Sequence, residues 1–199
     1  RSQINPHFLY NTLEAIQGIA LEHGVPKIAD AAGALGKLFR HNIQGSDMIP
    51  LGKELEITQA YLTIQKLRFA DKLNVLISIR ENTRGIPVMK LLLQPLVENA
   101  LLHGILYCDK TEKRLVIRAW RSSRAFGVEI EDNGNGMAPE TAQKLTELDI
   151  RTSKSYGVAN VHKRLDIFGQ GKCKFYISAR EGIGTCVMIE LPVQPHDSD

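Results

Sequence analysis

The second half of the chain contains, in this order, the blocks ENALLHG (residues 98–104), EDNGNGM (131–137) and YGVAN (156–160). The first block places a carboxamide on a predicted helix, the second a carboxylate before two glycines, and the third a glycine at the start of another helix. Such groups are suited to hold a nucleotide together with its metal ion. Each block alone is weak evidence, whereas their order and spacing make the set specific.

Around these blocks the hydrophobic pattern predicts an α+β fold. Alternating Leu73, Val75, Ile77 and Ile79 indicate a half-buried strand. Further strands are predicted at residues 114–120, 125–131, 172–179 and 184–191, and helices at 87–106, 138–148 and 157–169. Pro95 should kink the first of these helices. We therefore expect an α/β sandwich, that is, a mixed sheet with helices on one face.

The first seventy residues predict helices only, at residues 6–24, 26–45 and 51–69. Pro6 opens the first helix and Pro26 opens the second. In the third, the apolar residues Leu55, Leu62 and Phe69 are spaced seven apart. This spacing suits helix-on-helix packing, either within the chain or with a twin subunit.

Composition excludes several function classes. The 199 residues carry a net charge of +3 and are 43% hydrophobic and 24% charged, which is typical of a globular protein. The small, interspersed charge does not favour nucleic-acid or membrane-surface binding, and no apolar run approaches membrane-spanning length. The cysteines lack metal-ligand spacing and favour buried thiols in a reducing compartment: Cys108, Cys173 and Cys186. Because the chain begins at Arg1, within a motif, we interpret it as a fragment whose missing N-terminal part could carry membrane spans or a sensor.

Glu98, Asn99 and His103 are the candidate site residues of the first block. Asn99 and His103 are four residues apart and therefore share one face of a helix. A side-chain carbonyl suits Mg²⁺, and His103 could donate to a phosphate oxygen. Glu98 could polarise an attacking group or a water molecule. Taken alone, solvated helix residues explain Asn99 and His103 equally well.

Asp132 is the candidate of the second block, where it ends a strand and precedes Gly134 and Gly136. A carboxylate in this place can accept a hydrogen bond from an exocyclic amine such as that of adenine, and the glycines let the backbone approach a flat base. A plain Asp-Asn-Gly turn is the simpler explanation of this block in isolation. The chain has no Gly-Lys-Ser or Gly-Lys-Thr loop, which excludes a Walker-type phosphate site.

The third block offers an anion site, because Gly157 starts a helix whose N–H groups and dipole attract phosphate. The polar stretch between Gly136 and Gly157 could close over a ligand as a lid. Thr185, after a turn, could bridge to a base through water, although most threonines in such places only favour the strand.

The three blocks resemble the N, G1 and G2 boxes of the ATPase superfamily that contains gyrase, MutL, heat-shock chaperones and histidine kinases. The resemblance implies ATP as the ligand, Mg²⁺ ligation by Asn99 and adenine recognition by Asp132. It further implies phosphate, lid or adenine-pocket contacts for Gly134, Gly136, Gly157, Asn160 and Thr185. One position departs from the pattern: Ser155 stands where the G2 box usually has its first glycine. A serine in place of this glycine affects the flexibility expected of the lid and the turnover rate. It does not remove the phosphate site at the start of the helix.

A fourth stretch, QINPHFLYNTL at residues 3–13, contains His7 in the first turn of a helix. The positive end of the helix dipole disfavours an imidazolium there and so favours the neutral ring that a nitrogen nucleophile requires. Asn11, one turn later, could orient the ring. From chemistry alone, a surface histidine in a capped helix is the favoured interpretation.

This stretch resembles the phosphoacceptor box of LytS/YesM-type sensor histidine kinases. Two more stretches resemble the same family, namely IQKLRF (64–69), preceded by Glu54 and Tyr61, and LLQPLVENA (92–100). The resemblance implies a protein histidine kinase in which His7 receives the γ-phosphoryl group of ATP, with Glu98 or Asn11 assisting. It also implies a homodimer formed by the N-terminal helices, a response-regulator aspartate as the next acceptor, and a cytoplasmic domain of a cell-membrane sensor.

Under this hypothesis, residues 1–70 form the helical dimerisation and phosphotransfer segment, 71–193 the ATP-binding domain and 194–199 a disordered tail. Two alternatives stay open. A gyrase- or chaperone-type ATP hydrolase would use Glu98 to activate water, but no transducer segment is visible after the nucleotide fold. A non-catalytic ATP-sensing dimer would use His7 only for packing, and Ser155 gives this second alternative some support.

Overall fold

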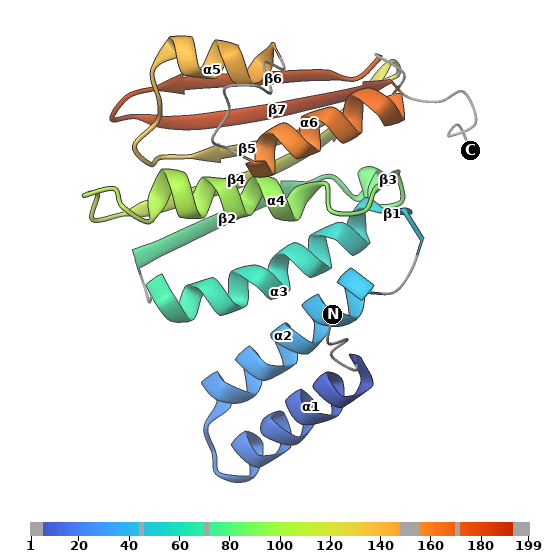
Figure 1. Ribbon diagram of the computed structural model, residues 1–199, viewed down its shortest axis with the longest axis vertical. Coiled ribbons are helices and arrows are strands. Elements are labelled where there is room, and N and C mark those ends of the chain that lie inside the picture. The colour runs from blue at the N-terminus through green and yellow to red at the C-terminus, as the bar shows by residue number, and fades with distance from the viewer. Residues whose placement is uncertain (1–5, 44–45, 70–71, 148–155, 170–171, 193–199) are drawn as a thin grey trace.

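The computed structural model describes residues 6–43, 46–69, 72–147, 156–169 and 172–192 (Figure 1). Its helices are α1 (Pro6–Glu22), α2 (Pro26–Ile43), α3 (Leu51–Phe69), α4 (Leu93–Asn99), α5 (Pro139–Thr146) and α6 (Tyr156–Gly169), with a 3₁₀ turn η2 (Glu81–Thr83) and a π-helix η3 (Ala100–Ile105). Its strands are β1 (Met48–Pro50), β2 (Leu73–Ile79), β3 (Pro87–Met89), β4 (Lys113–Arg121), β5 (Ala125–Asp132), β6 (Lys174–Arg180) and β7 (Gly184–Pro192). Residues 148–155 of the predicted lid, among them Ser155, and the predicted tail lie outside the described residues.

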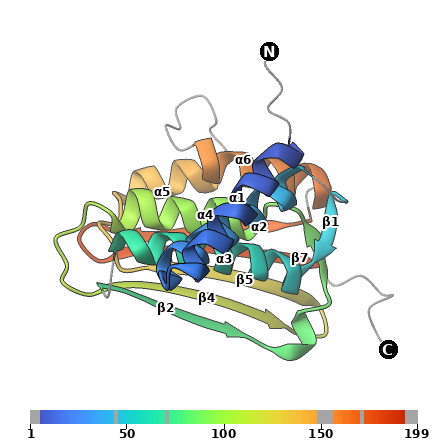
Figure 2. The ribbon, with the colours of Figure 1, turned by 90° about the horizontal axis from the view of Figure 1, so that it is seen from below.

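The main sheet has the strand order β2-β4-β5-β7-β6. β2 pairs with β4 in parallel, and the other neighbours pair antiparallel. Helices α3 to α6 lie on one side of this sheet, and the α1–α2 hairpin lies beyond α3 (Figures 1 and 2). The predicted mixed sheet with helices on one face is therefore confirmed. In the described part of the chain, no helix is both long and apolar enough to cross a bilayer.

A continuous hydrophobic core joins α3 to the sheet. Leu51 and Leu55 of α3 belong to the same buried cluster as Leu96 of α4 and Ile117 of β4. Burial of each such leucine or isoleucine stabilises the folded protein by about 1.5–3 kcal/mol. Because these residues share one cluster, α3 is part of the helical layer that covers the sheet. The α1–α2 hairpin contacts α3 through α2. A domain boundary at residue 70 stays a prediction, because α3 packs on both the hairpin and the sheet layer.

The predicted helix over residues 87–106 is wrong in its first part. Pro87–Met89 is strand β3, which pairs antiparallel with β1. The chain then turns at Leu91, whose φ is 59°, before α4 begins at Leu93. Pro95 lies in the first turn of α4, where no backbone N–H is needed for an intrahelical bond, so the kink expected at Pro95 has no physical cause.

Candidate functional site

The first block occupies the end of α4 and the π-helix η3. Glu98 and Asn99 lie in the last turn of α4, and the exposed His103 lies in η3. The wider turn is marked by a bond from the Leu106 N–H to the carbonyl of Leu101, 2.8 Å long. Single π-turns inside α-helices are frequent at functional sites because they reorient the side chains that follow.

Glu98 is held by its own helix. The Gln94 Nε2 donates to Glu98 Oε1 over 2.8 Å, one turn apart. Tyr61 of α3 is also close enough for its pKa to respond to Glu98. Burial, followed by the negative charge of Glu98, raises the pKa of Tyr61 to about 12. The charge of Glu98 therefore acts on a side chain of α3.

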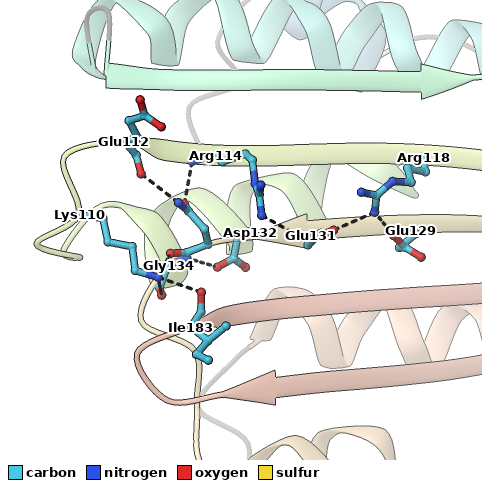
Figure 3. Close-up of polar contacts among 10 residues, drawn as sticks. Lys110, Glu112, Arg114, Arg118, Glu129, Glu131, Asp132, Gly134 and Ile183 are labelled. Atoms are coloured by element: carbon cyan, nitrogen blue, oxygen red, sulfur yellow. Dashed lines mark hydrogen bonds and ion pairs between the residues drawn. The ribbon is translucent and has the colours of Figure 1, made fainter.

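Asp132 ends β5 and is buried, with only 6% of its surface exposed (Figure 3). Its Oδ1 accepts the N–H of Gly134 at 2.8 Å, and it lies opposite Thr185 of β7 in the antiparallel ladder. Burial raises the pKa of the Asp132 carboxyl to about 6, although the N–H groups of Gly134 and Thr185 and the charge of Lys110 act in the other direction. The carboxylate thus has fewer compensating donors than its desolvation requires.

Glycines bring the first two blocks into backbone contact. A Cβ at Gly104 would lie 2.6 Å from Asp132 Oδ1, and a Cβ at Gly134 would overlap the backbone of Gly104. The Asn135 N–H donates to the Gly104 carbonyl at 2.9 Å. Gly136 has a φ of 66° and would overlap the Arg180 carbonyl if it carried a side chain. These positions therefore require glycine, and the structure gives each requirement a specific neighbour.

Two residues that the sequence did not single out fix the loop after β5. Lys110 Nζ donates to the carbonyls of Asn133 at 2.6 Å and Ile183 at 2.9 Å, which ties the loop to the β6–β7 turn (Figure 3). The Asn133 side chain accepts from the Arg114 N–H at 2.7 Å and donates to the Glu112 carbonyl at 2.9 Å. An isolated lysine in a polar connection gives no periodic signal, so a pattern could not have indicated Lys110.

The third block begins α6, which packs beside α4 (Figure 1). Gly157 lies in the first turn of α6, and Asn160 is exposed one turn later. Val158, Val161 and Leu165 anchor the helix in the core. The structure therefore brings the first block to the second at Gly104, and it packs α6, which begins at the third block, beside α4, which ends in the first.

His7 and Asn11 lie elsewhere, on the exposed surface of α1. The Asn11 Nδ2 is 3.3 Å from His7 Nδ1, one helical turn away. The α1–α2 hairpin lies on the far side of α3 from the sheet (Figure 1). The structure does not bring His7 to the three blocks.

Comparison with known proteins finds a family match in each part of the chain. Residues 1–73 match the family described as Histidine kinase, and residues 89–195 match the family described as Histidine kinase-, DNA gyrase B-, and HSP90-like ATPase. The sensor histidine kinase YesM of Bacillus subtilis is 30% identical over 96% of this chain and 32% of its own length. The sensor protein LytS of the same organism is 31% identical over 98% of this chain and 33% of its own length. The chain thus spans about a third of these relatives.

Solved structures show the same fold. The histidine kinase domain of the Erythrobacter litoralis EL346 blue-light activated histidine kinase aligns with a TM-score of 0.57 at 19% identity, covering 96% of this chain and 95% of that one. The catalytic domain of the histidine kinase ThkA aligns with a TM-score of 0.56 at 12% identity, covering 78% and 100%. Because the family models match both parts of the sequence, the chain belongs to the histidine kinases, with their histidine kinase segment first and their ATPase-like domain after it.

Proposed function

We propose that this chain is the catalytic core of a sensor histidine kinase, which transfers the γ-phosphoryl group of ATP to His7 and then to an aspartate of a response-regulator protein. The observation that carries this proposal is the buried Asp132 carboxylate, enclosed by glycine backbone from the first block. A carboxylate short of donors in an apolar setting is a suitable acceptor for the exocyclic amine of adenine.

The other residues of the three blocks fit the rest of the nucleotide. The Asn99 carbonyl would hold Mg²⁺, which when bound neutralises phosphate charge. His103 and the N–H groups at the start of α6, around Gly157, would bind phosphate oxygens. We assign Thr185 to the adenine pocket. We assign the remaining phosphate or lid contacts to Gly134, Gly136 and Asn160.

The chemistry at His7 is an in-line displacement. A ring nitrogen of His7 attacks the γ-phosphorus, the bond to the β–γ bridging oxygen breaks, and ADP leaves with that electron pair. The Asn11 amide can present its oxygen as well as its nitrogen to Nδ1. With the oxygen accepting the Nδ1 proton, the lone pair for attack is on Nε2. Attack leaves the phosphorylated ring positively charged, and Glu98 would take up the Nδ1 proton that restores the neutral ring.

His7 does not lie beside the three blocks of its own chain. α1 and the three blocks lie on opposite sides of α3 (Figure 1), so transfer requires either movement of the α1–α2 hairpin or delivery of His7 by a second subunit. Apolar side chains exposed on α1 favour a homodimer: Phe8, Ile16 and Ile19 are 68%, 42% and 58% exposed. We assign the dimer to the cytoplasmic side of a membrane-bound sensor.

Incubation with γ-labelled ATP and Mg²⁺ tests the function. Acid-labile, base-stable label on the protein supports the kinase. Release of free phosphate without phosphoprotein would indicate an ATP hydrolase instead, and nucleotide binding without either product would indicate an ATP-sensing dimer.

Nucleotide affinity should depend on pH through Asp132. Because the pKa of this carboxyl is about 6 in the free protein, we expect the affinity for ADP to be constant above pH 7 and to fall by up to about tenfold per pH unit below pH 6. Calorimetric titration of ADP between pH 5 and pH 8, without Mg²⁺, measures this dependence. A flat profile would argue against a charged Asp132 as the adenine ligand.

Gly104→Ala should weaken ADP binding at least about tenfold, because the added Cβ would lie 2.6 Å from Asp132 Oδ1 and displace that carboxylate. Gly85→Ala is the matched control, since an added Cβ there has no neighbour within 4 Å. ADP titrations of both variants measure the effect. Equal affinities in the two variants would show that the carboxylate position is not needed for binding.

A further inference from the structure

The turn that precedes α4 is held by a buried carboxylate from α3. Glu54, 1% exposed, accepts the N–H of Leu91 at 2.7 Å, of Leu92 at 3.0 Å and of Leu93 at 3.0 Å. These N–H groups belong to the start of α4 and have no intrahelical acceptor, so Glu54 caps the helix from outside and complements its dipole. His41 of α2, whose Nε2 is 3.4 Å from Glu54 Oε1, closes the other side of the carboxylate.

The same turn is held on its carbonyl side by α6. Arg164 Nη2 donates to the Lys90 carbonyl at 2.6 Å, and Arg164 Nη1 donates to the Leu91 carbonyl at 3.3 Å. One turn of backbone is thus bound by a negative charge from α3 and a positive charge from α6. Leu91, with a φ of 59°, is the one non-glycine residue in the described ranges with this left-handed conformation, and the bonds from Glu54 and Arg164 compensate for that strain.

The far end of the α4–η3 helix is fixed in a similar way. Lys113 Nζ, buried beneath η3, donates to the Ile105 carbonyl at 2.8 Å and the Cys108 carbonyl at 3.0 Å. Charges of opposite sign therefore hold the two ends of the helix that carries Asn99. The turn at residues 90–93 is the end that also contacts α6, the helix that begins at the third block.

We propose that Glu54 and Arg164 are positioning residues of the nucleotide site: through the turn at residues 90–93 they hold α4, with Asn99, in fixed register with α6, the helix that begins at the third block. This inference rests on the proposed function. Neither residue touches the nucleotide. Each acts on the backbone that places the Mg²⁺ ligand, so the loss of either should weaken the metal-dependent part of nucleotide binding and leave the adenine pocket on β5 and β7 unchanged.

The test is calorimetric titration of the whole chain with ADP, in the presence of Mg²⁺ and in the presence of EDTA. For Glu54→Gln and Arg164→Met we expect the gain in affinity due to Mg²⁺ to fall by about 10–100-fold, as is usual when a group supporting a metal ligand is removed. Affinity in EDTA should change by less than about threefold. The double variant should lose little more than either single variant, because both act on the same turn.

Glu56→Gln is the matched control for Glu54→Gln, because it is the same change on the same helix at an exposed carboxylate, 2.8 Å from Lys53. Arg164→Lys keeps the charge and should restore part of the Mg²⁺ effect. It also supplies the test if Glu54→Gln does not fold. Retention of the full Mg²⁺ effect in the variants, or an equal loss of affinity with and without Mg²⁺, would overturn the inference. Absence of any ADP binding in the wild type would overturn the proposed function, and this inference with it.

Discussion

His7→Gln is expected to abolish formation of labelled phosphoprotein, with a loss of at least about 1,000-fold in the rate of autophosphorylation. Glutamine has a similar polarity and reach, but its amide nitrogen is not a nucleophile and cannot form a phosphoramidate of this kind. His7 is exposed on α1, and its Nδ1 lies 3.3 Å from the Asn11 Nδ2. The substitution should therefore change the free energy of unfolding by less than about 0.5 kcal/mol.

The affinity of His7→Gln for ADP shows whether the variant lacks only the chemical step or is misfolded. Because the three blocks lie on the other side of α3 from α1 (Figure 1), the affinity of His7→Gln for ADP and Mg²⁺ should equal that of the wild type. His23→Gln is the matched control: it is the same change at another exposed histidine, whose Nδ1 is 2.9 Å from the Ile19 carbonyl. Phosphoprotein formed at the wild-type rate by His7→Gln would place the acceptor elsewhere and refute the assignment of His7.

Asn11 should act on the same step to a smaller degree. Asn11→Ala removes the side chain beside His7 Nδ1, so the ring loses its orienting contact while its nucleophilic nitrogen remains. We expect a reduction of about tenfold in the autophosphorylation rate at saturating ATP, with unchanged affinity for ADP. Single-turnover labelling measures the rate. An unchanged rate would show that Asn11 does not orient the ring.

The parts of the fold that the sequence predicted correctly are those with a local signal. Periodicity of two marked β2, and periodicity near 3.6 with proline at the start marked α1 and α2. Residues 87–106 lacked such a signal: three short elements follow one another there, and the pairing of β3 with β1 is decided by residues about forty positions away. The helix prediction failed at Pro87 because a proline can begin a strand as well as a helix.

The same distinction applies to the site. Asp132 and its glycines were identifiable because one short block contains them, and the structure adds the reason for Gly104, which is close approach to that carboxylate. Glu54 could be matched to a family pattern, but its burial and its bonds to residues 91–93, thirty-seven to thirty-nine positions later, depend on how α3 packs on α4. Lys110 and Arg164 likewise act on backbone carbonyls, and a backbone acceptor leaves no mark in a sequence.

Asp132→Asn is expected to remove nucleotide binding and at the same time to stabilise the nucleotide-free protein. The amide is uncharged, and its nitrogen is a donor that faces the donor amine of adenine, so the affinity for ADP should fall by at least about 100-fold. The stabilisation comes from the pKa of Asp132, raised by burial from the ordinary 3.8 to about 6. A raised pKa means that the charged carboxylate is disfavoured in the folded state relative to the unfolded chain.

The pH dependence of this stabilisation has a definite sign. Below pH 3.8 the carboxyl is neutral in the folded and the unfolded protein and does not lower the free energy of unfolding. As the pH rises towards 6, the carboxyl ionises first in the unfolded chain, so the wild type loses stability until the carboxyl is charged in the folded protein as well. The full difference corresponds to about 3 kcal/mol at 1.36 kcal/mol per pH unit, and the lost acceptor for the Thr185 N–H reduces the net gain of Asn to about 1–2 kcal/mol. Urea unfolding at pH 4 and pH 7.5 should therefore show Asp132→Asn more stable than the wild type at pH 7.5, with the advantage much reduced at pH 4. A variant less stable than the wild type at pH 7.5 would mean that the buried charge is fully compensated, and the argument that adenine supplies the missing donor would fail.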